Sequence, residues 1–596
     1  MHPIQTLLII LSLLTILKFS RVFAIFGGRP ARVPPYDDPV VFINHVGRFS
    51  RVEGYFNPST ALYTFRGIRY AEPPIRENRF MRPNLKRLKG DVDARKNAPP
   101  CPQPDYYDPR KIIGDEDCLA LNIFTPQMPD ESSGLPVILF IHGGGYRYGS
   151  ASQYGAEPIT QENVIFVPIQ YRLGTLGILG DGTRDFGGNV AIFDMHAALK
   201  WITQYISFFG GDKNKIKVMG HGSGASAAMF LTRSPYGRSS VDGVIAMSGS
   251  SLDQYSYQED GKNSTEEIAN AHNCSHDNEM KLLHCLRTKS IDDIITKDSN
   301  LQIERLQNKD IVKSMSGMVG TSPNIESKDD DRGLPGIITE NPKESMKKEP
   351  EKRIPILIGS TKHETANIMN PKEVTKIFGS ASNFLKLSMN ALKLNDLLNV
   401  TNSKVSSVLG LLNIPALNDY LTVPENLSPE KMLNKLIDVS TDIFFNIPIT
   451  LTANLWSKFA PAFFYQFDHV GDSSGGGKHF LKPLPLVSNG NSKGYVAHGD
   501  ELSYLFDAYD VFGNRINETE LKSPRDQEAR KNFIKTVTQF AYMNESNSQM
   551  SLNGQLLDIF KADSTNFIKI SDKLTFDKNF RICELSVLEN SVGAKS

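Results

Sequence analysis

The hydrophobic positions of this chain fall mainly in short continuous runs that alternate with segments of helical periodicity. Six such runs lie at residues 135–142, 164–171, 215–220, 243–248, 354–360 and 460–467. Each is apolar at successive positions, which is typical of strands buried on both faces of a parallel sheet. Between two of them, apolar residues recur at three- and four-residue spacing until Gly210 and Gly211. The pattern predicts an α/β fold with a large, mostly parallel central sheet covered by helices on both faces.

Three stretches interrupt this alternation. Residues 326–352 are dense in charge and proline and predict a solvated loop region, and the glycine-rich residues 471–479 predict a flexible connector. Residues 380–445 are rich in helical signals without strand signals, so we expect them to cap the sheet. None of these stretches has the character of a domain boundary, and residues 25–596 are therefore expected to form a single domain.

The beginning of the chain has the composition of a secretory leader. An apolar run from Leu7 to Leu17 precedes the small-residue pattern Val22-Phe23-Ala24, which predicts a signal peptide over residues 1–24. The run is shorter than a membrane span, although Lys18 and Arg21 after it leave a retained N-terminal anchor as the alternative. No later stretch approaches 18 apolar residues. The mature chain is expected to be secreted, with no membrane span.

The net charge of the chain indicates which kinds of binding partner are favoured. The chain carries 66 basic and 66 acidic residues, so bulk charge does not favour nucleic acid or an acidic membrane surface. Acceptor motifs for N-glycosylation agree with a secreted protein, and they lie at Asn263, Asn273, Asn399, Asn517 and Asn544, with a sixth at Asn426 weakened by Pro429.

Cysteine usage also suits an oxidising compartment. Two local pairs, Cys101 with Cys118 and Cys274 with Cys285, would each close a short loop, which is the simplest interpretation of four of the five cysteines. Cys583 is left over, either as a buried thiol or as an intermolecular link.

The stretch Val218–Met229, "VMGHGSGASAAM", has the context of a nucleophile elbow, with a strand before it and a small-residue helix after it. In that turn only the central residue of five directs its side chain into the site, and here it is Gly222. Ser223 is expected to offer its backbone amide while its side chain turns away. Ser226 lies in the next helical turn, and both serines are interpreted as packing residues.

Three further elements are candidates for chemistry. The glycines after the strand in "FIHGGGYRYG" would expose backbone N–H groups, as stabilisation of an oxyanion requires, or they serve turn geometry alone. Glu364 follows a predicted strand and His498 precedes a predicted helix, in the order of acid then histidine expected of the partners of such an elbow. A lone Glu or His is usually structural or solvated, so chain order and context are what favour function.

Several blocks then point to one family. They are "FRGIRYAEPP" (65–74), "EDCLALNIFTP" (116–126), "HGGG" (142–145), "YRLGTLGILG" (171–180), "GGNVAIFDMHAALKWI" (187–202) and "AMSGSS" (246–251). With these blocks in order, the chain resembles the type-B carboxylesterase/cholinesterase family over nearly its whole mature length. The resemblance implies an α/β-hydrolase fold and supports the disulfides Cys101–Cys118 and Cys274–Cys285.

The resemblance also assigns roles, position by position. Glu364 takes the acid position and His498 the base position. The oxyanion donors fall on Gly143, Gly144 and Ser223. The nucleophile position falls on Gly222, and His221 stands where many active members carry glutamate. Without a nucleophile no acyl-enzyme forms, and such a loss typically lowers turnover by about 10⁶.

A subgroup of this family lacks the nucleophile, and the chain is similar to its members glutactin and the neuroligins. The resemblance implies a secreted, catalytically inactive protein for extracellular recognition or adhesion, with a protein partner and a possible homodimer through residues 525–543. It implies no cofactor and no metal. Two alternatives stay open: an ester hydrolase that uses Ser223, Ser226 or a water activated by His498, and a small-molecule carrier.

Overall fold

The computed structural model describes residues 39–581 except for 107, 109, 129–133, 254, 308–321, 368–371, 373, 376–378, 386–418, 425, 472–475, 482–493, 517–520, 544–548 and 562–563. The chain divides into two units, Met1–Pro39 and Val40–Ser596, and the description below concerns the second. The predicted signal peptide and Cys583 lie outside the described residues, as do Asn399, Asn517 and Asn544.

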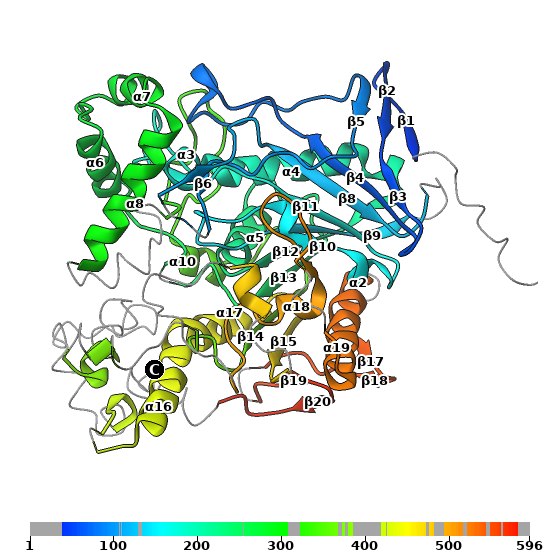
Figure 1. Ribbon diagram of the computed structural model, residues 1–596, viewed down its shortest axis with the longest axis vertical. Helices are drawn as coiled ribbons and strands as arrows, with labels where there is room; N and C mark the ends of the chain where they lie inside the picture. Colours follow the sequence, from blue (N-terminus) through cyan, green and yellow to red (C-terminus); the bar gives the residue numbers. More distant parts are fainter. Residues whose placement is uncertain are drawn as a thin grey trace, which may run out of the picture. The chain divides into compact units, whose positions relative to one another are not determined.

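One large sheet forms the centre of the unit (Figure 1). Its strands, in chain order, are β3 (Tyr55–Asn57), β4 (Leu62–Arg69), β8 (Ala120–Thr125), β9 (Leu135–Ile141), β11 (Ile165–Ile169), β12 (Gly211–His221), β13 (Gly243–Met247), β14 (Ile356–Thr361), β15 (Ala462–Phe467), β19 (Phe567–Ile570) and β20 (Leu574–Asp577). Over the described residues they lie side by side in the order β20-β19-β15-β14-β13-β12-β9-β11-β8-β4-β3. Neighbours from β19 through β11 pair in parallel, and β20, β8, β4 and β3 pair antiparallel. The predicted mostly parallel sheet is confirmed.

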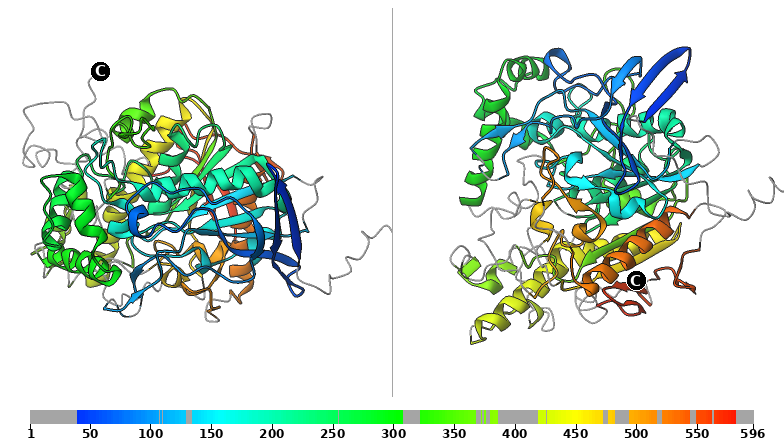
Figure 2. Two further views of the ribbon diagram at one scale, coloured as in Figure 1. Left: turned by 90° about the horizontal axis from the view of Figure 1, so that it is seen from above. Right: turned by 45° about the vertical axis from the view of Figure 1, so that its right-hand side comes forward.

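Helices cover both faces of the sheet, and strands β11, β13 and β14 are accordingly buried at every position. Along β9, Ile138 and Phe140 belong to one buried cluster, whereas Val137, Leu139 and Ile141 belong to the other. The second cluster is covered by α4 (Val190–Tyr205), α5 (Ser223–Arg233), α10 (Pro342–Lys347), α16 (Pro429–Thr441) and α17 (Ile447–Ser457). The first is covered by α2 (Glu157–Thr160), α18 (Leu502–Leu505) and α19 (Pro524–Ala541). The right-hand view of Figure 2 shows the orange helix α19 beside the sheet.

Two smaller groups of elements lie at the periphery. A three-stranded sheet is formed by β1 (Val40–His45), β2 (Arg48–Glu53) and β5 (Gly90–Asp93). A helical group consists of α6 (Lys262–Ala271), α7 (Glu279–Arg287) and α8 (Ile291–Gln307), which pack around a cluster of their own. Both groups are seen at the upper edge of Figure 1.

The two predicted disulfides are present. Cys101 is bonded to Cys118 across a separation of 17 residues, and Cys274 to Cys285 across 11. The glycosylation candidates Asn263 and Asn273 have exposed side chains in the same helical region as the second bond.

Residues 326–352 differ from the solvated loop that their charge density predicts. Glu326 is buried, and its Oε1 atom accepts hydrogen bonds from the amides of Ile337 at 2.9 Å and Ile338 at 3.1 Å. Helix α10 occupies residues 342–347 of the same stretch. In the sequence, a buried glutamate that accepts hydrogen bonds from backbone amides cannot be distinguished from a glutamate on the surface. The prediction of a solvated loop was wrong here for this reason.

One helical stretch was not anticipated as an apolar segment. Helix α16 continues through the π-helical turn η4 (Asp442–Asn446) into α17, and residues 429–457 are long and apolar enough to cross a membrane by length and composition. Most of its apolar window, 89%, is buried inside the protein, and a core helix meets the same criteria.

Candidate active site

The elbow predicted around Gly222 is built as strand, turn and helix. Strand β12 ends at His221, Gly222 forms the turn with φ 54° and ψ −121°, and α5 begins at Ser223. Gly220 and Gly224 allow the close packing around it, since a Cβ on either would lie about 2 Å from a backbone oxygen. The turn conformation is strained for residues with a side chain, and glycine adopts it easily.

An acid–histidine pair faces this turn. Glu364 follows β14, and its Oε2 atom accepts a hydrogen bond of 2.6 Å from Nδ1 of His498. The backbone holds the pair in place, because the His498 amide donates to the Glu364 carbonyl at 3.0 Å and the Thr361 amide to Glu364 Oε1 at 2.6 Å. Burial acts to lower the pKa of His498, but the Glu364 carboxylate outweighs it, and the pKa lies above its ordinary value.

The predicted nucleophile and base positions come together. A Cβ placed on Gly222 would lie 3.3 Å from Nε2 and 3.6 Å from Cε1 of His498, and outside Gly222 and its two chain neighbours no other described atom lies within 4 Å of it. A serine at this position would therefore present its hydroxyl to the free ring nitrogen of His498. In this chain the place of that hydroxyl is open.

Backbone amides predicted as oxyanion donors lie beside the elbow. The loop after β9 passes close to the end of β12, since a Cβ on Gly143 would lie 2.7 Å from the His221 carbonyl oxygen. In the described part of the chain, no hydrogen bond uses the amides of Gly143 or Gly144. The Ser223 amide stands at the first position of α5, where a helix offers no acceptor of its own. The site thus retains donors suited to a developing negative charge.

The two serines near the elbow use their hydroxyls elsewhere. Ser223 Oγ accepts a hydrogen bond from the Tyr146 amide at 3.3 Å. Ser226 Oγ donates to the Ser250 carbonyl at 2.8 Å. Both side chains are buried, and neither forms a hydrogen bond with His498 within the described residues. Their geometry matches that of packing residues.

A second histidine–carboxylate pair lies next to the first, and the sequence analysis did not find it. His221 Nε2 donates to Glu501 Oε1 at 3.1 Å, and Ser248 Oγ donates to the same oxygen at 2.8 Å. The rings of His221 and His498 lie 4.6 Å apart between centroids. The one available signal was that Glu501 stands three residues after His498 at a predicted helix start.

Burial sets the electrostatics of this second pair. Both side chains are fully buried, and burial lowers the pKa of His221 although Glu501 opposes the shift. The pKa of Glu501 is lowered, because its bonds to His221 and Ser248 outweigh burial. A neutral imidazole therefore donates to a carboxylate, and His221 Nδ1 is buried without a described hydrogen-bond partner.

Other buried groups complete the surroundings. Burial raises the pKa of Asp253 well above its ordinary value, and Asp253 lies near enough to Glu364 and His498 to interact electrostatically. The Phe445 ring lies 5.1 Å from that of His498. Among the residues described, no group of three or more His, Cys, Asp and Glu side chains is placed to hold a metal ion.

Comparisons with known proteins agree with this geometry. The carboxylesterase family matches residues 37–586. Esterase E4 of Myzus persicae is 29% identical over 550 residues, covering 89% of this chain and 91% of the relative. Juvenile hormone esterase of Tribolium castaneum is 28% identical over 546 residues, covering 90% and 88%. Among solved structures, a PNB esterase matches with a TM-score of 0.67 and 22% identity over 92% of this chain and 100% of that chain, which shows a shared fold.

Proposed function

The chain belongs to the carboxylesterase family, and from that premise we propose that it is a catalytically inactive member that acts in extracellular recognition or adhesion. The observation that carries this proposal is Gly222 at the tip of an otherwise complete elbow, 3.3 Å from His498 Nε2 at its Cβ position. A base, an acid and oxyanion donors surround a place where no attacking atom is attached. Acyl transfer needs that atom, so the retained groups cannot start the reaction.

An extracellular role is supported by features away from the site. Two disulfides are formed, and such bonds persist in oxidising compartments. Asn263 and Asn273 carry glycosylation motifs on exposed side chains. The predicted signal peptide over residues 1–24 would deliver the chain to that compartment. A balanced charge of 66 basic and 66 acidic residues favours a protein partner over nucleic acid.

The competing function is ester hydrolysis without the serine. It is supported by the relatives, which carry the name esterase, and by the intact pairing of Glu364 with His498. In that mechanism His498 would activate a water molecule in the open place beside Gly222. A carrier that binds an ester or acid without turnover would use the same place. Both alternatives keep a ligand in the site, whereas a recognition protein uses its surface.

Covalent labelling tests the proposal without knowledge of the substrate. The purified chain is incubated with an organophosphate, and its intact mass is measured beside that of an active serine esterase. We expect no adduct on this chain and no turnover of a short-chain aryl ester above the buffer rate. A stoichiometric adduct, or ester turnover that disappears in His498→Ala, would overturn the inactive assignment.

Secretion and partner binding need their own measurement. The full chain is expressed in insect cells with its own N-terminus, and the medium is analysed before and after treatment with a glycosidase. We expect a secreted form whose mass falls on deglycosylation and which binds to cell surfaces. Binding that is unchanged by protease treatment of the cells would count against a protein partner.

A further inference from the structure

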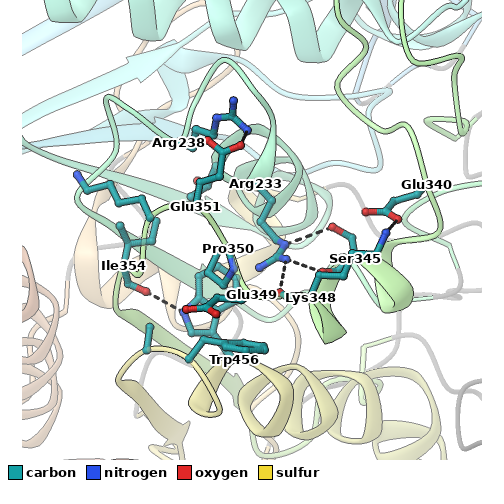
Figure 3. A pocket seen from close by; sticks show the side chains of 14 residues that line it. Arg233, Arg238, Glu340, Ser345, Lys348, Glu349, Pro350, Glu351, Ile354 and Trp456 are labelled. Carbon is teal, nitrogen blue, oxygen red and sulfur yellow. Dashed lines mark hydrogen bonds and ion pairs between the residues drawn. The ribbon is translucent and has the colours of Figure 1, made fainter.

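A pocket lies at the opposite end of α5 from the elbow. It has a volume of about 190 Å³. Arg233, the last residue of α5, is among the residues that line it, and Figure 3 shows it at the centre of the view. A helix of this length places Arg233 roughly 15 Å along the axis from Gly222. The pocket is therefore separate from the acid–histidine site.

Arg233 differs from Arg238 and Lys348, two other cations that line the pocket, in its partners. Its Nη2 atom donates to the carbonyl of Ser345 at 2.6 Å and to that of Lys348 at 3.4 Å, and its Nε atom donates to Ser345 Oγ at 3.4 Å. All these acceptors are neutral, and no ion pair within the described residues includes Arg233. Arg238 and Lys348, by contrast, pair with Glu351 and Glu340.

The Arg233 guanidinium retains donors for a further acceptor. Nη1 has no hydrogen bond in the described part of the chain, whereas Nε and Nη2 hold the end of α10. Burial lowers the pKa of Arg233 below its ordinary value, and the more distant Glu340 only partly opposes this shift. A partly buried cation without a carboxylate partner gains more from binding an anion than an exposed one does.

Part of the pocket wall is apolar, and the Arg233 guanidinium lies over it. The Trp456 ring centroid lies 6.0 Å from the guanidinium carbon of Arg233. Its indole Nε1 donates to the Ile354 carbonyl at 2.8 Å, which fixes the ring (Figure 3). Pro350 and Phe459 extend this surface. An apolar wall beside a guanidinium that has no carboxylate partner suits a small molecule that has an apolar body and a single negative charge.

We propose that this pocket binds a small organic monocarboxylate, with the carboxylate on Arg233 and the apolar group against Trp456. A guanidinium matches a carboxylate in geometry as well as charge. A phosphate dianion fits less well, because Arg238 and Lys348 already pair with Glu351 and Glu340, and Arg233 alone would have to neutralise most of a second negative charge. The volume suits a ligand smaller than a typical drug molecule. This site is independent of the proposed function.

The main competing role for Arg233 is a structural clamp on α10. A clamp predicts lower stability when Arg233 is replaced, but it predicts no ligand response. The chain has two tryptophans, Trp201 and Trp456, and Trp201 is fully buried in the core. Trp456 lines the pocket and Trp201 does not, so a change in tryptophan fluorescence on binding there is assigned to Trp456.

The test titrates benzoate into the full chain at neutral pH, with benzamide as the neutral isostere. We expect a saturable fluorescence change with benzoate. Benzamide should bind at least about tenfold more weakly, because it lacks the negative charge and loses one charge-assisted contact with Arg233. Arg233→Met should weaken benzoate binding by a similar factor, whereas the exposed-arginine control Arg110→Met and the site variant His498→Ala should not.

Two results would overturn the proposal. One is no saturable response to benzoate, and the other is an equal response to benzoate and benzamide. Because both concern the unaltered protein, they decide the question even if Arg233→Met fails to fold. Loss of the response in His498→Ala would place the ligand in the other site and would likewise reject this assignment.

Discussion

The Nε2 atom of His498 lies 3.3 Å from the position that a Cβ atom on Gly222 would occupy. This distance separates the predicted base position from the predicted nucleophile position of the elbow. It shows that the residues around the elbow keep the arrangement in which a serine hydroxyl would meet the histidine.

Gly222→Ser is therefore expected to create a nucleophile. The rate of hydrolysis of a short-chain aryl ester should rise by at least about 10²-fold over that of the unaltered chain. A complete triad contributes a factor of roughly 10⁶ to turnover, so this increase is only part of the full effect. An organophosphate should then form one adduct per chain. Gly222→Ala is the matched control, since it adds the Cβ atom without the hydroxyl and should show neither effect. Equal rates for the two variants would mean that the remaining groups are not aligned for catalysis.

His221 is expected to matter for stability through Glu501. His221→Leu leaves the Glu501 carboxylate buried with only Ser248 as a described side-chain donor, and we expect the free energy of unfolding to fall by about 3 kcal/mol. His221→Gln keeps a donor and should lose less than half as much. Urea unfolding curves measure both values, and equal losses would show that side-chain volume, rather than the hydrogen bond, determines the effect.

The pH dependence of stability should report on His498. Its pKa in the folded chain is raised, so its contribution to stability is fully present below the unfolded pKa of about 6.5 and is lost as pH rises through the folded value. Glu364→Gln removes the carboxylate that raises this pKa and should flatten that loss. NMR titration of the histidine ring gives the midpoint directly. A midpoint in the unaltered chain at or below 6.5 would contradict the expectation.

The Cys101–Cys118 bond should stabilise the fold measurably. It closes a loop across a separation of 17 residues, and both cysteines are fully buried. Replacing both by alanine is expected to lower the free energy of unfolding by about 3 kcal/mol through the loop entropy of the unfolded chain. Denaturation under non-reducing conditions measures this loss, and the Cys274–Cys285 pair provides a second bond of shorter span for comparison. A loss below about 1 kcal/mol would contradict the assignment of a stabilising role.

The sequence allowed those parts of the fold and of the candidate site to be predicted that depend on the order of neighbouring residues along the chain. Buried strands appear as apolar runs, so the sheet and the ends of β12 and β14 could be placed. The turn position of Gly222 could be predicted because it lies between a strand and a helix. The pairing of Glu364 with His498 could be predicted from the order of the two residues along the chain.

The remainder of the site depends on contacts that no local pattern contains. His221 and Glu501 are 280 residues apart, and they meet because β12 and the turn before α18 end at the same place. Glu326 has the composition of a surface residue, and only the packed structure shows that it organises buried backbone amides. Which buried polar groups pair with one another depends on how distant segments pack, and the periodicity of the sequence contains no information about that packing.

The left-handed conformation of Gly222 has a consequence for how this protein can change. A residue with a side chain at that turn costs on the order of 1–3 kcal/mol in backbone strain, and glycine avoids most of it. A typical domain has only about 5–15 kcal/mol of net stability, so this difference is a substantial margin. With glycine at position 222, the chain can tolerate other substitutions that together lower its free energy of unfolding by up to this amount. A serine placed at position 222 would remove this margin, so any gain of activity from that substitution would be accompanied by a loss of stability.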